Sequence, residues 1–202
     1  MDKTKEDHES DEMTEIAIVG DLTDNENELT DRLLSLPTGA ECTLYFDSPG
    51  GSPYCAVSLT TIMMLRDLRA TGIVTGECSS ASLWPLAACK RRIVTPFSVL
   101  LFHPMKWQSE EHVGLAEASE WARHFGQLET EMDRWLAQLF GVSEEVLEDW
   151  IRPGRYVSGT EFSQSGLAEL AMLNPASSIA KPYAAGNGSK NQRRLDRLHE
   201  PI

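Results

Sequence analysis

Residues 43–51, TLYFDSPGG, and 73–82, IVTGECSSAS, both run from apolar residues into a turn of small residues. Short apolar runs that end at turn residues are typical of buried β-strands. Each stretch is followed by apolar residues at helical spacing, at 56–68 after the first and at 83–89 after the second. Strand, turn and helix therefore alternate, which predicts an α/β fold with a largely parallel sheet.

The neighbouring segments continue this alternation. A strand is predicted at residues 16–19, and a helix capped by Asp24 follows it as far as Leu36. Two further strands are predicted at residues 93–94 and 99–102. Two short helices are predicted as well, one after Ser143 and one after Ser158, which has the capping-box spacing with Glu161.

One long helix is predicted between residues 113 and 140. Large apolar side chains recur in it at steps of four and three, namely Trp121, Phe125, Leu128, Met132, Trp135 and Leu139. Because an apolar stripe of this size is rarely left in water, it packs on its own domain or on another subunit. We expect a subunit contact.

The composition predicts three parts: a disordered acidic arm at residues 1–15, one folded domain at 16–173, and an extended or mobile tail at 174–202. The chain has 31 acidic against 18 basic side chains and no basic stripe, so nucleic acid is not an expected partner. It has neither a signal-peptide pattern nor a run of about 18 apolar residues. We therefore expect a soluble, cytoplasmic protein that does not bind membranes.

Four cysteines lie in apolar or small-residue stretches, at Cys42, Cys55, Cys78 and Cys89. They form no CxxC pair and no metal-ligand spacing, so buried, reduced thiols are expected and no metal site. An active-site thiol at Cys78, two residues from Ser80, is the alternative.

Two polar residues stand where strands end. Ser80 lies at a junction between strand and helix, where free backbone N–H groups favour a developing oxyanion, although a helix cap explains the serine equally well. His103 ends the apolar strand 99–102, and open parallel sheets collect functional groups at the carboxyl ends of strands. A histidine there suits a general base near neutral pH, whereas a structural role is the alternative.

The order and spacing of these features resemble one known family. Residues 46–51, Phe-Asp-Ser-Pro-Gly-Gly, look like the strand and SPGG turn of the Clp protease proteolytic subunit family, and residues 76–82 occupy the place of its nucleophile motif. The spacing from Gly51 to Ser80 matches without a gap. Residues 96–103 are similar to the segment that ends in the family's catalytic histidine.

The resemblance covers about residues 16–173 and implies a ring-forming Clp/crotonase-like fold, in which repeated ββα units form a spiral domain with a protruding handle helix. The helix at 113–140 resembles that handle, through which two rings interlock. The resemblance also implies stacked heptameric rings, polypeptide substrates, and an ATP-dependent unfoldase or a paralogous subunit as partner. The chain has no nucleotide-binding loop of its own, and no cofactor is expected.

Site residues follow from the same resemblance, position by position. Ser80 is matched with the nucleophile and His103 with the general base. Gly51 and Ala81 match the residues whose backbone amides form the oxyanion hole. The segment from Ser52 to Cys55, with Ser52, Pro53 and Tyr54 as substrate-binding residues, would line a groove for an extended peptide.

The chain departs from the family's pattern at two places. Around Ser80 the chain reads Cys-Ser-Ser-Ala-Ser, whereas the family usually has small residues followed by serine, methionine and glycine. Ser79 is therefore the alternative nucleophile if the alignment shifts by one residue. Aligned without gaps, the family's catalytic aspartate falls on Gly154. Loss of that aspartate costs about 10⁴-fold in turnover in a well-studied serine protease. Glu148 and Asp149 are the nearest replacements, but the helix predicted to carry them would hold them away from the histidine.

Three functions remain open from the sequence. The first is a serine endopeptidase that serves as the proteolytic component of an ATP-dependent protease in protein quality control. The second is a catalytically degenerate subunit with a structural or regulatory role, which Gly154 favours. The third is an acyl-CoA enzyme of the related crotonase-like fold, against which the presence of both Ser80 and His103 argues.

Overall fold

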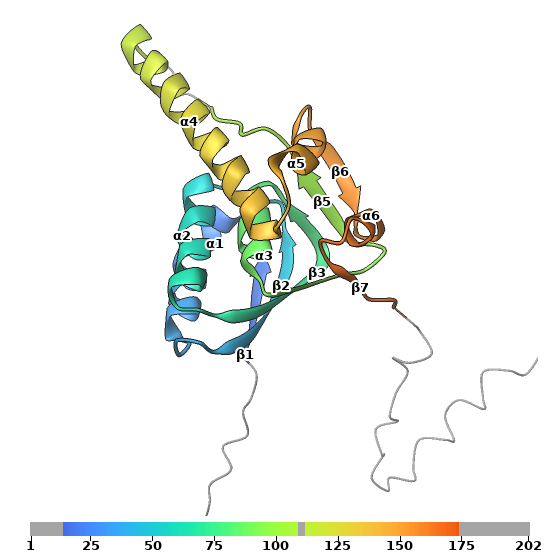
Figure 1. The fold of residues 1–202 in the computed structure, drawn as a ribbon. Coiled ribbons are helices and arrows are strands. Elements are labelled where there is room, and N and C mark those ends of the chain that lie inside the picture. The colour runs from blue at the N-terminus through green and yellow to red at the C-terminus, as the bar shows by residue number, and fades with distance from the viewer. Residues whose placement is uncertain (1–13, 109–111, 174–202) are drawn as a thin grey trace, which may run out of the picture. The chain divides into compact units, whose positions relative to one another are not determined.

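The computed structural model describes residues 14–108 and 112–173 of the chain. In this part seven strands form a single sheet (Figure 1). The strands are β1 (Thr14–Val19), β2 (Glu41–Ser48), β3 (Arg69–Ser79), β4 (Arg91–Val94), β5 (Val99–Phe102), β6 (Arg155–Ser158) and β7 (Glu169–Leu170). Of the arm predicted to be disordered at 1–15, residues 1–13 lie outside the described residues, as does the tail predicted to be mobile at 174–202. The last two residues of that arm, Thr14 and Glu15, are instead the start of β1, because they pair with β2.

The sheet is parallel except at one pair, as the alternation of strands and helices predicts. Its order is β1-β2-β3-β4-β7, and β5 pairs with both β3 and β6. The long strand β3 pairs with two further strands along its length: residues 71–74 pair with β4, and residues 77–79 pair with β5. The β5–β6 pair is antiparallel, with Phe102 opposite Arg155. This arrangement brings the ends of β3 and β5 side by side.

Six α-helices accompany the sheet in the described residues. They are α1 (Leu22–Ser35), α2 (Pro53–Leu65), α3 (Leu83–Ala88), α4 (Leu115–Phe140), α5 (Glu144–Ile151) and α6 (Gly159–Gln164), with a short 3₁₀ helix at Ser80–Ser82. α1 packs on α2, α2 on α3, and α3 on α4. No helix in the described ranges combines the length and the apolar character needed to cross a membrane.

Several predicted boundaries are corrected. α1 is capped by Asp21 and not by Asp24, because β1 ends at Val19 and Asp21 Oδ1 accepts a hydrogen bond from Thr23 N at 2.8 Å. α2 begins at Pro53, three residues earlier than predicted, because Ser52 caps it. By contrast, the capping interaction between Ser158 and Glu161 is confirmed, with a distance of 3.2 Å from Glu161 N to Ser158 Oγ.

The long helix α4 differs in character between its two halves. Its buried side chains all lie in the second half, at Met132, Leu136, Ala137 and Phe140, whereas its first half extends away from the sheet (Figure 1). The predicted stripe is therefore only partly the packing face, because Trp135 and Leu139 stay half-exposed. In the first half, Trp107 of the same chain covers part of Trp121 and Phe125, with ring centroids 5.7 and 5.5 Å away.

All four cysteines are buried and unpaired by disulfides, which confirms the prediction of reduced, buried thiols. Burial raises the pKa of Cys78 to about 12, and its sulfur lies 3.4 Å from Ser82 Oγ. A thiol of this kind is not ionised near neutral pH. These observations argue against the alternative of an active-site thiol.

Candidate active site

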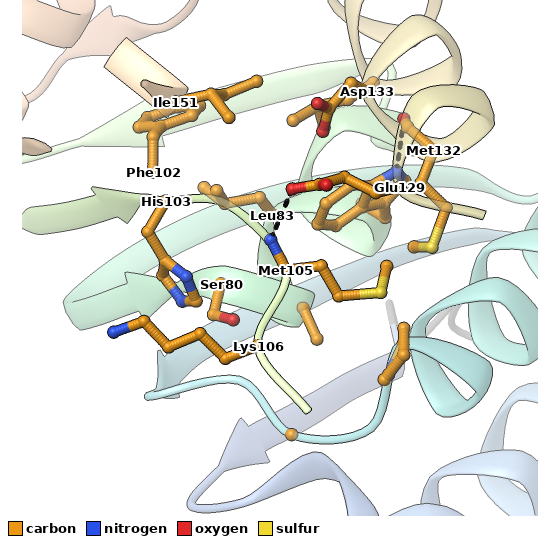
Figure 2. A pocket seen from close by; sticks show the side chains of 15 residues that line it. Ser80, Leu83, Phe102, His103, Met105, Lys106, Glu129, Met132, Asp133 and Ile151 are labelled. Atoms are coloured by element: carbon orange, nitrogen blue, oxygen red, sulfur yellow. Dashed lines mark hydrogen bonds between the residues drawn. The ribbon is translucent and has the colours of Figure 1, made fainter. Parts of the chain in front are cut away.

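A pocket opens between the turn after β2, the 3₁₀ helix after β3, the end of β5, and the helices α3, α4 and α5 (Figure 2). It holds about 580 Å³ of empty space, part of which is open to solvent. Its lining includes four of the residues matched with catalytic or oxyanion-hole positions, namely Ser80, His103, Gly51 and Ala81. Residues that are far apart in the sequence are therefore brought to a single cavity.

Ser80 has a backbone conformation that is unusual for its residue type. It follows the last residue of β3 directly, and its φ of 55° lies in the left-handed region. Such strain in a non-glycine residue is more frequent at functional sites than elsewhere. Ser79, the alternative nucleophile, is 1% exposed, and its Oγ has no hydrogen-bond partner in the described residues. Ser80 lines the pocket and Ser79 does not.

The glycine turn after β2 packs directly against the serine turn. A Cβ at Gly50 would lie 2.7 Å from Ser79 O, 2.8 Å from Ser80 Cβ and 2.9 Å from Ala81 N. Gly50 also has a φ of +106°, so both the space and the conformation require glycine here. A Cβ at Gly51 would lie 2.6 Å from Asp21 Oδ1. The two glycines therefore let the turn pack closely on its neighbours, and Gly51 lines the pocket.

His103 follows β5, so its position is set by the pairing of β5 with β3 and β6. In Figure 2 its ring lies beside Ser80. Its Nδ1 lies 2.6 Å from the carbonyl oxygen of Pro104. No hydrogen bond joins Ser80 to His103 within the described residues, so the two side chains must approach further for proton transfer. Loose contacts of this kind are common in ligand-free sites.

Gly154 lies beside His103, at the place where the resemblance expects an aspartate. A Cβ at Gly154 would lie 3.3 Å from His103 Cβ, and the φ of Gly154 is +116°. Neither of the two nearby acids predicted as replacements lines the pocket: Glu148 pairs with Arg152 at 3.6 Å, and Asp149 is exposed. Position 154 is therefore next to the histidine but provides no carboxylate.

Two carboxylates that the sequence analysis missed line the pocket from α4. Glu129 accepts a hydrogen bond from Met105 N at 2.8 Å, and Asp133 accepts one from the Arg152 guanidinium at 2.9 Å. Arg152 also lies 3.8 Å from Glu129. Burial raises the pKa of Asp133 above its usual value, although Arg152 opposes this shift. The spacing of four residues, which puts Glu129 and Asp133 on one face of α4, was the available signal.

The residues matched with substrate binding lie in and beside the start of α2. Pro53 lines the pocket. The amide of Ser52 donates to Thr23 Oγ1 at 2.8 Å, and the Tyr54 hydroxyl lies 2.8 Å from His124 Nε2 on α4. Cys55 is fully buried. The predicted groove segment is thus a helix start, and of its residues Pro53 is the one that reaches the pocket.

A protein-family model matches this chain. The family model described as Clp protease matches residues 10–174, which is most of the chain. A search of curated proteins found no significant match. The chain therefore belongs to the Clp protease family, a family of serine peptidases that generally assemble into rings and work with unfoldases.

Proposed function

We propose that this protein is a serine endopeptidase that hydrolyses unfolded polypeptides, with Ser80 as nucleophile and His103 as general base. The observation that carries the proposal is the meeting of the strained Ser80 with His103 in one pocket, at adjacent ends of β3 and β5. A hydroxyl and an imidazole placed in this way are the minimal groups for acyl transfer.

The reaction has two steps that share one base. Ser80 Oγ attacks the carbonyl carbon of the peptide bond while its proton passes to His103 Nε2. The C–N bond then breaks, and the amine leaves with that proton. Water attacks the resulting ester, His103 accepts a proton from the water, and the proton returns to Ser80 as the carboxylic acid is released.

The oxyanion that forms in each step would be held by the amides of Gly51 and Ala81. Both residues line the pocket, and neither amide donates a hydrogen bond elsewhere in the described residues. Ala81 lies in the first turn of the 3₁₀ helix, where N–H groups lack partners within the helix.

The substrate side chain next to the cleaved bond would enter the apolar part of the pocket. Leu83, Met132, Leu136 and Ile151 line that part. Pro53 lies at the pocket, while Ser52 and Tyr54 lie just beyond it, so we place the adjacent substrate residues along the start of α2. The apolar lining favours unfolded polypeptides, because folded proteins bury most of their large apolar side chains.

The first half of α4 is proposed as a handle that joins subunits into rings, with stacked heptamers expected. Support comes from the half-exposed aromatic side chains Trp121 and Phe125 in that half, since an apolar surface of this kind is an interaction site more often than free surface. An ATP-dependent unfoldase would deliver the substrate, because the chain has no nucleotide-binding loop of its own. Light scattering coupled to size exclusion tests the assembly, and a monomer would contradict it.

The test of the chemistry is intact-mass analysis after treatment with a fluorophosphonate probe, which reports an activated serine without requiring the right substrate. We expect one adduct on the parent protein and on Ser79→Ala, and none on Ser80→Ala. Ser79→Ala is the matched control because it removes the adjacent hydroxyl. An adduct that persists on Ser80→Ala would contradict the assignment of the nucleophile.

A second candidate function is that of a degenerate subunit that assembles but does not cleave. The observation that favours it is Gly154, which lies beside His103 and has no carboxylate to offer it. Such a subunit would be useful in mixed rings with an active paralogue. Absence of an adduct on a correctly assembled ring would favour this candidate over the peptidase.

A further inference from the structure

His103 has a hydrogen-bond partner although the acid of the triad is missing. The carbonyl oxygen of Pro104 lies 2.6 Å from His103 Nδ1, which is within hydrogen-bonding distance. A carbonyl oxygen carries no proton and can only accept. The proton in this contact must therefore lie on Nδ1 of the imidazole.

This contact decides which nitrogen of the neutral ring is basic. When Nδ1 carries the proton, Nε2 has the free lone pair and can accept a proton from a hydroxyl. The aspartate of a Ser-His-Asp triad fixes the same tautomer, and a triad held in the wrong tautomer loses about 10⁴-fold in turnover. The Pro104 carbonyl can thus supply the orienting part of the missing acid's role.

No carboxylate in the described residues competes for this role. Glu129 is held by the Met105 amide and Asp133 by Arg152. Neither forms a hydrogen bond with His103 in the described residues. Lys106, which also lines the pocket, can only donate when charged and so cannot orient an Nδ1–H group.

We propose that the main-chain carbonyl of Pro104 is the positioning group of His103 and replaces the side-chain acid of the triad. The inference rests on the proposed function of Ser80 and His103 and adds how the base is oriented. A neutral oxygen stabilises the imidazolium less than a carboxylate does, so the site keeps the correct tautomer but loses part of the electrostatic stabilisation. The expected rate therefore lies between that of a full triad and that of a triad in the wrong tautomer.

The direct test is the tautomer of His103 in the resting, full-length protein. Magic-angle-spinning NMR of ¹⁵N-histidine-labelled protein at about pH 8, above the usual histidine pKa of about 6.5, distinguishes protonated from unprotonated ring nitrogens. The chain has five histidines, so His103→Gln assigns the signal. We expect a proton on Nδ1 and none on Nε2. A proton on Nε2 would overturn the proposal.

A pair of variants tests whether Pro104 causes that tautomer. Pro104→Gly frees the backbone next to His103, whereas Pro37→Gly makes the same change at an exposed turn outside the pocket. We expect Pro104→Gly to lower the fraction of the Nδ1–H form and to slow probe labelling about tenfold or more, up to the ~10⁴-fold cost of a wrong tautomer. Pro37→Gly should change neither quantity. A folded Pro104→Gly variant in which the Nδ1–H fraction falls and labelling does not slow would overturn the proposal, because the tautomer would then not control the reactivity of the site.

The two readouts keep the inference separate from the proposed function. The tautomer is measured without turnover, and it remains decisive if Pro104→Gly does not fold. An Nδ1–H ring in a protein that no probe labels would support the positioning contact and contradict the peptidase. Labelling together with an Nε2–H ring would support the peptidase and contradict the positioning contact.

Discussion

Replacing Gly50 by alanine tests the packing that shapes the nucleophile turn. The added Cβ would lie 2.7 Å from Ser79 O and 2.9 Å from Ala81 N. Both are backbone atoms, so they cannot move aside as the end of a flexible side chain can. We expect Gly50→Ala to destabilise the fold and to displace Ser80 and the Ala81 amide together.

The size of the effect follows from two costs. A side chain at a left-handed φ costs about 1–2 kcal/mol, and forcing an atom into a packed site costs about 1–3 kcal/mol. The sum is about 2–5 kcal/mol, a large part of the roughly 5–15 kcal/mol that stabilises a typical domain. Gly39→Ala is the matched control, because Gly39 has a φ of +77° and a Cβ there would meet nothing within 4 Å. Only the first cost applies to it.

Urea denaturation followed by tryptophan fluorescence measures the difference, at one fixed protomer concentration. Gly50→Ala should be less stable than Gly39→Ala by about 1–3 kcal/mol, which is the packing cost alone. Fluorophosphonate labelling should be slowed in Gly50→Ala and unchanged in Gly39→Ala. Equal unfolding midpoints for the two variants would refute the reasoning.

Two further predictions follow from titratable groups. Burial raises the pKa of Asp133 above 3.8, so the folded state binds its proton more tightly than the unfolded state and stability falls as pH rises from about 3.8 through the folded pKa. Over that pH range the free energy of unfolding, measured by urea denaturation, should fall less for Asp133→Asn than for the parent protein. A larger fall for Asp133→Asn would contradict the predicted direction. Burial also raises the pKa of Cys55 to about 11 and of Cys78 to about 12. Both thiols should resist alkylation at about pH 8 until urea unfolds the chain, and fast modification of the folded protein would contradict their burial.

The order of elements could be predicted from the sequence because it depends on local patterns. The strand at 99–102 and the cap at Ser158 are found as predicted, since apolar periodicity and capping act over a few residues. The start of α1 lies three residues before the predicted start, because a long-range contact holds the turn after the strand and lets Asp21 cap the helix. Gly20 N donates to Asp47 O on the neighbouring strand, at 3.0 Å. That contact places the turn before Asp21.

The packing face of α4 could not be predicted from the local sequence either. A heptad pattern indicates that a helix has an apolar stripe but not which neighbours cover it. The structure buries Leu136 and Phe140 and leaves Trp135 and Leu139 half-exposed. Contacts from other segments fix how α4 is rotated about its own axis. One of them is the hydrogen bond of 3.1 Å from Trp84 Nε1 to Met132 O.

The sequence by itself determined that Ser80 and His103 stand at strand ends, that two glycines follow the strand at 43–46, and that Gly154 stands where the family resemblance expects an acid. Only the tertiary structure decided what surrounds the histidine. The pairing of β5 with β6 brings Gly154 beside it, α4 brings Glu129 and Asp133 to the same pocket, and the backbone brings the Pro104 carbonyl to Nδ1. These partners depend on long-range packing and on backbone direction, and neither is written in the local pattern of residues.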